Sequence, residues 1–123
     1  MSYVVDSDWI SDALAGVQPA LELLEQLSPD GLAISIISVG EILEGAYGLP
    51  GPEAHRECFH EFMSGFNVLT LSEPIMDVFA GLRHQLRSQG QLIPDFDLLI
   101  AATALHHDLT LLTPQWFLSA SRR

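Results

Sequence analysis

Two aspartates, Asp6 and Asp8, follow directly on a short apolar run near the start of the chain. The run reads YVV, and the adjacent Val4 and Val5 are typical of a buried strand. A buried strand that ends in acids favours either a helix N-cap or a site for a cation. A cation site would need further oxygen ligands from other parts of the chain.

Two further acids, Glu41 and Asp97, are expected where helices begin. Glu41 is expected in the first turn of the helix that follows a second strand, LAISIIS at residues 32–38. Asp97, with Asp95 beside it, is expected in the first turn of an apolar helix that follows a proline. Capping explains each position equally well. Ser38 and Glu41 match a capping box, and the helix macrodipole favours acids in any first turn.

The elements that must position these acids alternate between strands and helices. Such alternation predicts parallel pairing and a doubly wound α/β sheet, in which ligands lie at the carboxyl ends of the strands. We therefore expect the acids to converge at that edge. The expected strands are the run before Asp6 and residues 32–38, 67–71 and 109–113, and the expected helices cover 7–16, 19–28, 38–48, 53–66, 72–90 and 95–108.

Converging carboxylates would repel one another. They raise each other's pKa unless a cation lies among them. Oxygen ligands favour Mg²⁺ or Mn²⁺ over zinc, and the sequence contains neither a CxxC nor an HExxH motif. We therefore expect Asp6, Glu41 and Asp97 to form a site for one of these two hard cations.

The composition restricts the class of protein. A chain of 123 residues suggests one domain over residues 1–123, and an apolar content of 48% argues against disorder. The single cysteine and the absence of a membrane-length apolar run predict a soluble, cytoplasmic protein without a membrane partner. A formal net charge of −11, with five arginines and no lysine, argues against broad nucleic-acid binding and favours a basic protein partner. It leaves open a nucleic-acid enzyme whose acids are neutralised by bound cations.

Three stretches, in this order, resemble the PIN domain, and within it the VapC-type toxins of bacterial toxin–antitoxin pairs. They are VVDSDWI, ISVGEILEGAYG and IPDFDLLIAATALHHDLTLLT. The resemblance implies a PIN-like three-layer α/β/α sandwich around a short, mostly parallel sheet of four strands, with a fifth strand left open. It also implies a small metal-dependent ribonuclease that cleaves RNA, is usually a homodimer and is held inactive by a cognate antitoxin.

The same resemblance implies roles for individual acids. Asp6, Glu41 and Asp97 match the acidic metal site of the family, so they are the expected catalytic residues and the expected ligands of Mg²⁺ or Mn²⁺. Asp95 matches a position that is often acidic and is a further candidate ligand. Asp8 matches a neighbouring Asn/Asp position and is expected to support the site.

The end of the chain departs from the family pattern. After the last strand the family usually shows Thr-x-Asn/Asp and a further acid, whereas this chain reads Thr113-Pro114-Gln115 and has no carboxylate after Asp108. The tail from about residue 113 is therefore atypical, with Thr113 and Gln115 in supporting roles and Gln115 offering only a neutral oxygen. The alternative function is a catalytically impaired PIN-like module that mainly binds an antitoxin.

Three other features leave alternatives open. A strand ending in Asp-x-Asp also begins haloacid-dehalogenase-like phosphatases, which normally use a lysine that this chain lacks. Arg83 and Arg87 lie four residues apart on one predicted helical face, which favours either simple solvation or a contact with phosphate or antitoxin. The apolar helices at 53–66 and 73–86 predict an exposed apolar surface for a dimer.

Overall fold

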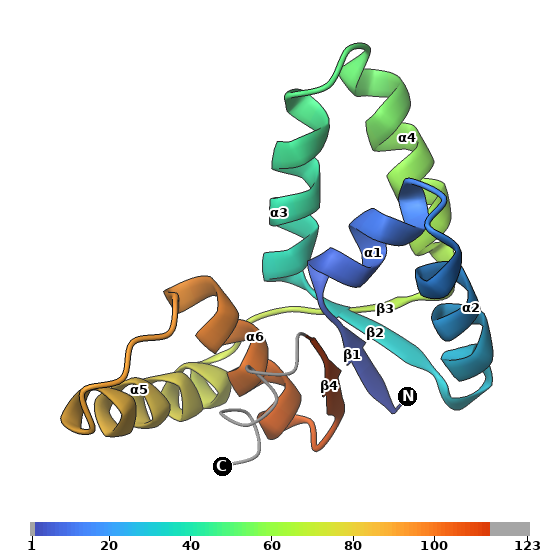
Figure 1. The fold of residues 1–123 in the computed structure, drawn as a ribbon. Helices are drawn as coiled ribbons and strands as arrows, with labels where there is room; N and C mark the ends of the chain where they lie inside the picture. Colours follow the sequence, from blue (N-terminus) through green and yellow to red (C-terminus); the bar gives the residue numbers. More distant parts are fainter. Residues whose placement is uncertain (1, 114–123) are drawn as a thin grey trace.

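The computed structural model describes residues 2–113 and contains a four-stranded sheet flanked by helices (Figure 1). The strand order is β3-β2-β1-β4, and every neighbouring pair is parallel. This confirms the α/β fold with four parallel strands. The elements are β1 (Tyr3–Val5), α1 (Ser7–Leu14), α2 (Gln18–Leu27), η1 (Ser28–Asp30), β2 (Leu32–Ser35), α3 (Ile36–Tyr47), α4 (Pro52–Phe62), η2 (Met63–Gly65), β3 (Asn67–Leu69), α5 (Glu73–Ser88), α6 (Asp95–His106) and β4 (Thr110–Leu112).

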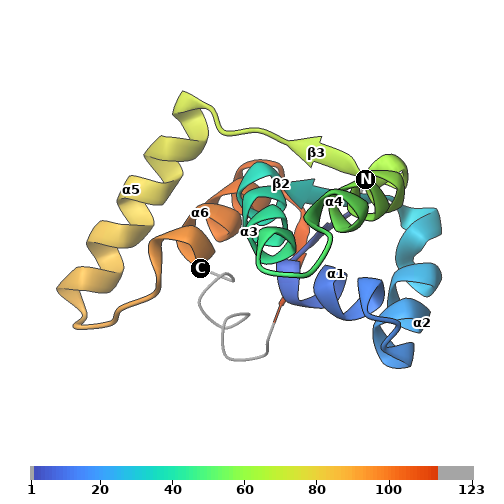
Figure 2. The same ribbon diagram turned by 90° about the horizontal axis from the view of Figure 1, so that it is seen from above.

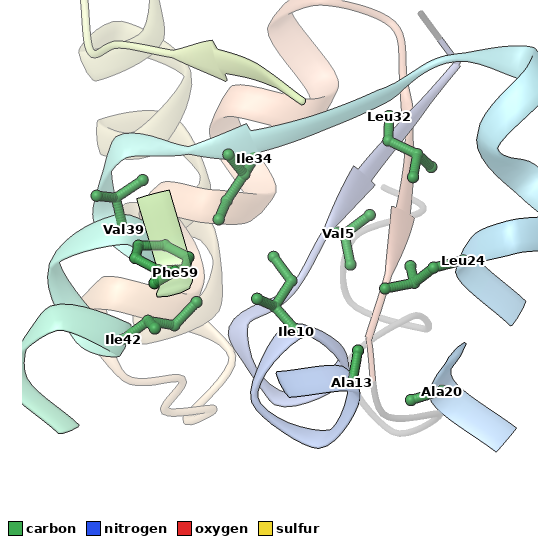
Figure 3. Close-up of a cluster of buried hydrophobic side chains, with 10 residues drawn as sticks. All are labelled: Val5, Ile10, Ala13, Ala20, Leu24, Leu32, Ile34, Val39, Ile42 and Phe59. Carbon is green, nitrogen blue, oxygen red and sulfur yellow. The ribbon is translucent and has the colours of Figure 1, made fainter. Parts of the chain in front are cut away.

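Helices cover both faces of the sheet. Val5 belongs to a buried cluster with residues of α1, α2, α3 and α4, which is drawn in Figure 3. Val4 belongs to a second cluster, which it shares mainly with α6. Successive strand residues thus point to opposite faces, and both valines are fully buried. The apolar run before Asp6 is therefore a strand enclosed between two helical layers, as the sequence predicts.

The helices are arranged differently on the two faces of the sheet. On the α6 side, α5 packs along α6 and forms an outer arm of the molecule, as Figures 1 and 2 show. On the other side, α3 and α4 form a hairpin that stands beside α1 and α2. The carboxyl end of β1 lies between these two groups of helices, which places Asp6 where they meet.

The second strand is shorter than predicted, and this changes the place of Glu41. β2 ends at Ser35 because the Ser35 hydroxyl accepts a 3.1 Å hydrogen bond from the backbone N–H of Ile37 and so caps α3. The predicted strand over 32–38 and the predicted capping box at Ser38 are therefore wrong. Glu41 lies in the second turn of α3 rather than in the first.

The helix predicted at 53–66 ends earlier and faces inward. α4 ends at Phe62 and is followed by the short η2. Phe59 is buried, and Phe62 and Met63 pack against the same core cluster. The large apolar residues of this helix therefore serve the core instead of forming the apolar surface expected for a dimer. Over residues 2–113, none of the helices is long and apolar enough to cross a membrane.

Candidate active site

Asp6 is fixed at the end of β1 by both of its carboxylate oxygens. Its Oδ1 accepts a 2.7 Å hydrogen bond from the backbone N–H of Ser7, and its Oδ2 accepts a 2.8 Å hydrogen bond from the Thr113 hydroxyl. The residue is 8% exposed and caps α1. Thr113 directly follows β4, which pairs with β1. Asp6 is thus both a helix cap and a carboxylate held in one orientation.

Glu41 reaches the same region from α3. It is partly buried, and its Oε1 accepts a 3.1 Å hydrogen bond from the Ser7 hydroxyl. Burial raises the pKa of Glu41, whereas the hydrogen bond from Ser7 lowers it. The negative charges of Asp6, Asp97 and Asp8 raise the pKa of Glu41 further. Repulsion of this kind is expected where carboxylates lie near one another.

Asp97 and Asp8 complete this group, which we call the carboxylate cluster (Asp6, Asp8, Glu41 and Asp97). Asp97 is the third residue of α6 and is partly buried. Burial raises the pKa of Asp97, and the charges of Asp6 and Asp8 raise it further. Asp8 is exposed on the first turn of α1, and partial desolvation, followed by repulsion from Asp6 and Asp12, raises its pKa. Four of the predicted acids therefore lie within electrostatic range of one another near the carboxyl end of β1.

Asp95 points elsewhere, although it lies only two residues before Asp97. Its Oδ1 accepts a 3.0 Å hydrogen bond from Nε of Arg83 on α5, and its side chain is 58% exposed. The structure therefore places Asp95 in an ion pair with α5 rather than with the other acids. Thr113 holds Asp6 as described above, while Gln115 lies outside the described residues.

The donor set of the carboxylate cluster suits a hard dication. Mg²⁺ and Mn²⁺ prefer carboxylate oxygens, and a bound dication would offset the repulsion that raises the pKa of Glu41 and Asp97. Between residues 2 and 113, no three His, Cys, Asp or Glu side chains stand close enough together to enclose an ion. Binding would therefore require Glu41 and Asp97, which are only partly buried, to turn toward the fixed Asp6.

Two serines lie beside the acids in places that the sequence does not predict. Ser7 links the first two acids, because its backbone N–H binds Asp6 and its hydroxyl binds Glu41. The position of Ser7 between Asp6 and Asp8 is the sequence feature that indicates a hydroxyl near these acids. Ser38 lies one turn before Glu41, is fully buried, and its hydroxyl has no hydrogen-bond partner within residues 2–113. The sequence predicts Ser38 as a strand end and helix cap, whereas the structure places it inside α3.

A largely apolar groove adjoins the cluster. It has a volume of about 370 Å³ and is formed by α1, α3 and α4. Its lining includes the apolar residues Leu14, Leu49 and Phe59 together with Glu41. A chain segment lying in this groove would therefore reach one of the four carboxylates.

Comparisons with known proteins agree with this geometry. The chain is 32% identical over 82 residues to Ribonuclease VapC4 of Mycobacterium tuberculosis. The match covers 65% of this chain and 63% of that protein, which is less than two thirds of the relative's length. The structure of this chain is similar to that of VapBC2 from Rickettsia felis bound to a DNA fragment from their promoter, with a TM-score of 0.86, 25% identity, and coverage of 94% of this chain and 89% of that chain. It is also similar to a toxin–antitoxin complex from Klebsiella pneumoniae, with a TM-score of 0.76, 28% identity, and coverage of 91% and 85%.

The match to a protein family is the broadest of these findings. Residues 3–114 match the PIN domain. The matched residues include every strand of the sheet and the whole carboxylate cluster. This match decides against the phosphatase that an Asp-x-Asp strand end also allows. The chain belongs to the PIN domain family.

Proposed function

We propose that this protein is a metal-dependent endoribonuclease of the VapC type, a toxin that cleaves RNA phosphodiesters and is neutralised by a cognate antitoxin. The observation that supports the proposal is that Asp6, Glu41 and Asp97, from three separate elements of a PIN domain, lie within electrostatic range of one another. The similarity to Ribonuclease VapC4 and to the toxin–antitoxin complex supports both the activity and the partner.

The residues of the chain have distinct parts in this activity. When bound, Mg²⁺ or Mn²⁺ supplies Lewis acidity for hydrolysis of the phosphodiester. Asp6 is held by two hydrogen bonds, so its carboxylate needs no rearrangement before it acts as a ligand. Ser7 holds Glu41 by a hydrogen bond from its hydroxyl, and Asp97 lies in the first turn of α6, so both carboxylates would turn toward Asp6 when the metal binds.

Protons compete with the metal in this site. Burial and mutual repulsion raise the pKa of Glu41 and Asp97, so both carboxyls hold a proton more readily than free ones do. Because these carboxyls must be ionised to act as ligands, metal affinity should rise with pH through the range in which they titrate. The bound dication would also offset the repulsion between the acids and the phosphates of RNA.

The groove beside Glu41 is the surface that we assign to the antitoxin. Its lining from α1, α3 and α4 is mostly apolar, which suits an apolar peptide segment. A basic side chain at the end of such a segment would pair with Glu41 and compete with the metal. Occupation of the groove would then suppress activity by acting directly on the carboxylate cluster.

A homodimer is also part of the proposal. Phe96 is 56% exposed in the first turn of α6, and Met76 is 40% exposed on α5. Large apolar side chains exposed to this extent favour a protein interface. We expect light scattering to show a dimer at tens of micromolar protein, and Met76→Ser to shift the equilibrium toward the monomer.

RNA cleavage with metal removal tests the activity. We expect the protein to cleave a mixed-sequence single-stranded RNA pool with Mg²⁺ or Mn²⁺, and to stop when EDTA is added or when Asp6 is changed to Asn. Asp30→Asn is the matched control, because it removes one exposed carboxylate just before β2, at the opposite end of the strands. Cleavage that survives EDTA or Asp6→Asn would contradict the mechanism. An absence of cleavage combined with full antitoxin binding would instead support the impaired module.

A further inference from the structure

Positive charge is scarce in this protein. Residues 2–113 contain three arginines, Arg56, Arg83 and Arg87, and no lysine. Arg56 on α4 lies over the ring of Tyr47, with its guanidinium carbon 5.2 Å from the ring centroid. This contact is in the α3–α4 hairpin, on the far side of the molecule from α5 (Figure 1). Within residues 2–113, Arg83 and Arg87 are thus the two arginines that lie near one another.

Arg83 and Arg87 line the same small cavity. They lie one turn apart on α5, and the cavity between α5 and the start of α6 has a volume of about 60 Å³. Gln91 adds a polar side chain to the lining, and Leu86 and Leu98 are among its apolar residues. A cavity of this size is too small to enclose a nucleobase but can receive the oxygens of a phosphate group.

Asp95 orients the guanidinium of Arg83 and leaves its two terminal nitrogens available. It binds Nε of Arg83 at 3.0 Å, and the two terminal nitrogens of this guanidinium make no other side-chain hydrogen bond in residues 2–113. Arg87 is exposed and forms no ion pair within the same residues. The cavity therefore combines the guanidinium of Arg83, which Asp95 orients, with the exposed guanidinium of Arg87, and Asp95 offsets one of the two charges.

The cavity and the carboxylate cluster flank the same helix start. Asp95, which binds Arg83, and Asp97, which belongs to the cluster, are the first and third residues of α6. Figure 2 shows α5 running beside α6 with the connecting segment at this end. We propose that Arg83 and Arg87 form a subsite for a backbone phosphate of the RNA that lies across the carboxylate cluster. The inference rests on the proposed ribonuclease activity.

RNA suits this subsite better than an acidic peptide does. A chain with a net charge of −11 repels polyanions in general, so a substrate needs a local cation to settle beside four carboxylates. A guanidinium offers several donors to one phosphate, in the paired geometry that phosphate oxygens accept. Holding a neighbouring phosphate would fix the register of the strand that passes over Asp97. The subsite then acts on substrate position rather than on the bond that is broken.

Salt dependence of RNA binding tests the subsite directly. In an Asp6→Asn background, which holds RNA without cutting it, binding of an end-labelled mixed-sequence single-stranded RNA is followed by fluorescence anisotropy over a range of KCl concentrations. Loss of one phosphate contact should reduce the slope of log affinity against log salt by ~0.7. We expect this change for Arg87→Gln and for Arg83→Gln. Arg56→Gln, which removes the same charge far from the cavity, should leave the slope unchanged.

The outcomes separate this inference from the activity on which it rests. With Asp6 intact, Arg87→Gln should raise KM for RNA and leave kcat nearly constant, because the contact is made equally before and during the reaction. If the unmodified protein cleaves RNA but Arg87→Gln and Arg56→Gln behave alike, the subsite is wrong and the activity stands. If Arg87→Gln weakens binding of polyglutamate but not of RNA, the surface is a protein contact and the inference is overturned. If the unmodified protein neither binds nor cleaves RNA, both proposals fall together.

Discussion

Thr113 donates a 2.8 Å hydrogen bond to Oδ2 of Asp6, although the two residues are 107 positions apart in the chain. Both side chains are buried, and the bond ties the residue after β4 to the residue after β1. The second oxygen of Asp6 is already engaged by the backbone N–H of Ser7. The orientation of the central carboxylate thus depends on the beginning of the tail, where the sequence departs from the family pattern.

Removing the Thr113 hydroxyl should therefore destabilise the fold and disturb the site. We expect Thr113→Val to lower the free energy of unfolding by ~1.5–3 kcal/mol, because a buried carboxylate oxygen loses its donor without a change in side-chain shape. Urea unfolding measures this change, and calorimetric Mn²⁺ titration should show weaker binding. Thr113→Ser keeps the hydroxyl and should restore most of both properties. Equal stability of the Val and Ser variants would show that the bond is unimportant.

Ser7 should control the ionisation of Glu41. Its hydroxyl donates to Oε1 of Glu41 and lowers the pKa of that carboxyl against the effects of burial and repulsion. We expect Ser7→Ala to raise the pKa of Glu41 further, as measured by NMR titration of the side-chain carboxyl carbon in metal-free protein. Ser11→Ala, on an exposed position of the same helix, is the control. A Glu41 titration that is identical in all three proteins would mean that the hydrogen bond does not persist in solution.

The stability of the metal-free protein should fall as pH rises through the range in which the cluster titrates. Burial raises the pKa of Glu41 and Asp97 above their ordinary values of 4.5 and 3.8. Between the ordinary and the raised pKa the folded state binds more protons than the unfolded state, so the free energy of unfolding decreases with increasing pH. We expect Glu41→Gln, measured in EDTA, to raise Tm by a few degrees at neutral pH and to have little effect well below pH 4.

A matched carboxyl on the same helix checks this assignment. Glu44 is exposed on α3, so Glu44→Gln removes one charge outside the cluster. Its effect on Tm at neutral pH should be smaller than that of Glu41→Gln. If the two variants shift Tm equally, the change reflects net charge and not repulsion within the cluster. Addition of Mg²⁺ should raise Tm of the unmodified protein and reverse the order of stability between it and Glu41→Gln.

The groove beside Glu41 allows antitoxin binding to be separated from catalysis. Leu49 lines the groove and is 48% exposed, so it can be changed without opening the core. We expect Leu49→Asp to weaken binding of the cognate antitoxin in calorimetric titration while free toxin still cleaves RNA. Val17→Asp places the same charge on an exposed apolar position outside the groove. This variant should bind the antitoxin with unchanged affinity. Unchanged antitoxin affinity in Leu49→Asp would exclude this groove as the binding surface.

The fold was largely predictable because its main signals are local. Alternating apolar strands and helices predicted a parallel sheet, whereas the place of β4 beside β1 depends on a crossover that the pattern does not specify. The boundary between β2 and α3 is hard to predict because β-branched isoleucines lie on both sides of it, at Ile34, Ile36 and Ile37. The hydroxyl that caps α3 belongs to Ser35, which lies among these isoleucines and accepts the hydrogen bond of Ile37.

The site was predictable to the level of elements but not of hydrogen bonds. Parallel strands place their carboxyl ends at one edge, so acids after β1 and in α6 could be expected to meet. The hydroxyl donors to Asp6 and Glu41 could not be predicted, because Thr113 reaches Asp6 through the pairing of β4 with β1, and Ser7 reaches Glu41 through the packing of α3 on α1. The choice between Asp95 and Asp97 was also open, since residues two apart on a helix face different directions.

Asp95 and Asp97 should therefore differ sharply in their effect on metal binding. Asp97 lies in the carboxylate cluster, whereas Asp95 is paired with Arg83. We expect Asp97→Asn to weaken Mn²⁺ binding strongly in calorimetric titration, because a neutral amide is a poorer ligand for a hard dication than a carboxylate. Asp95→Asn should leave Mn²⁺ affinity nearly unchanged. It should also strengthen RNA binding in the Asp6→Asn background, because it removes the charge that offsets Arg83. If Asp95→Asn weakens Mn²⁺ binding as much as Asp97→Asn does, Asp95 is a ligand, and its ion pair with Arg83 must open when the metal binds.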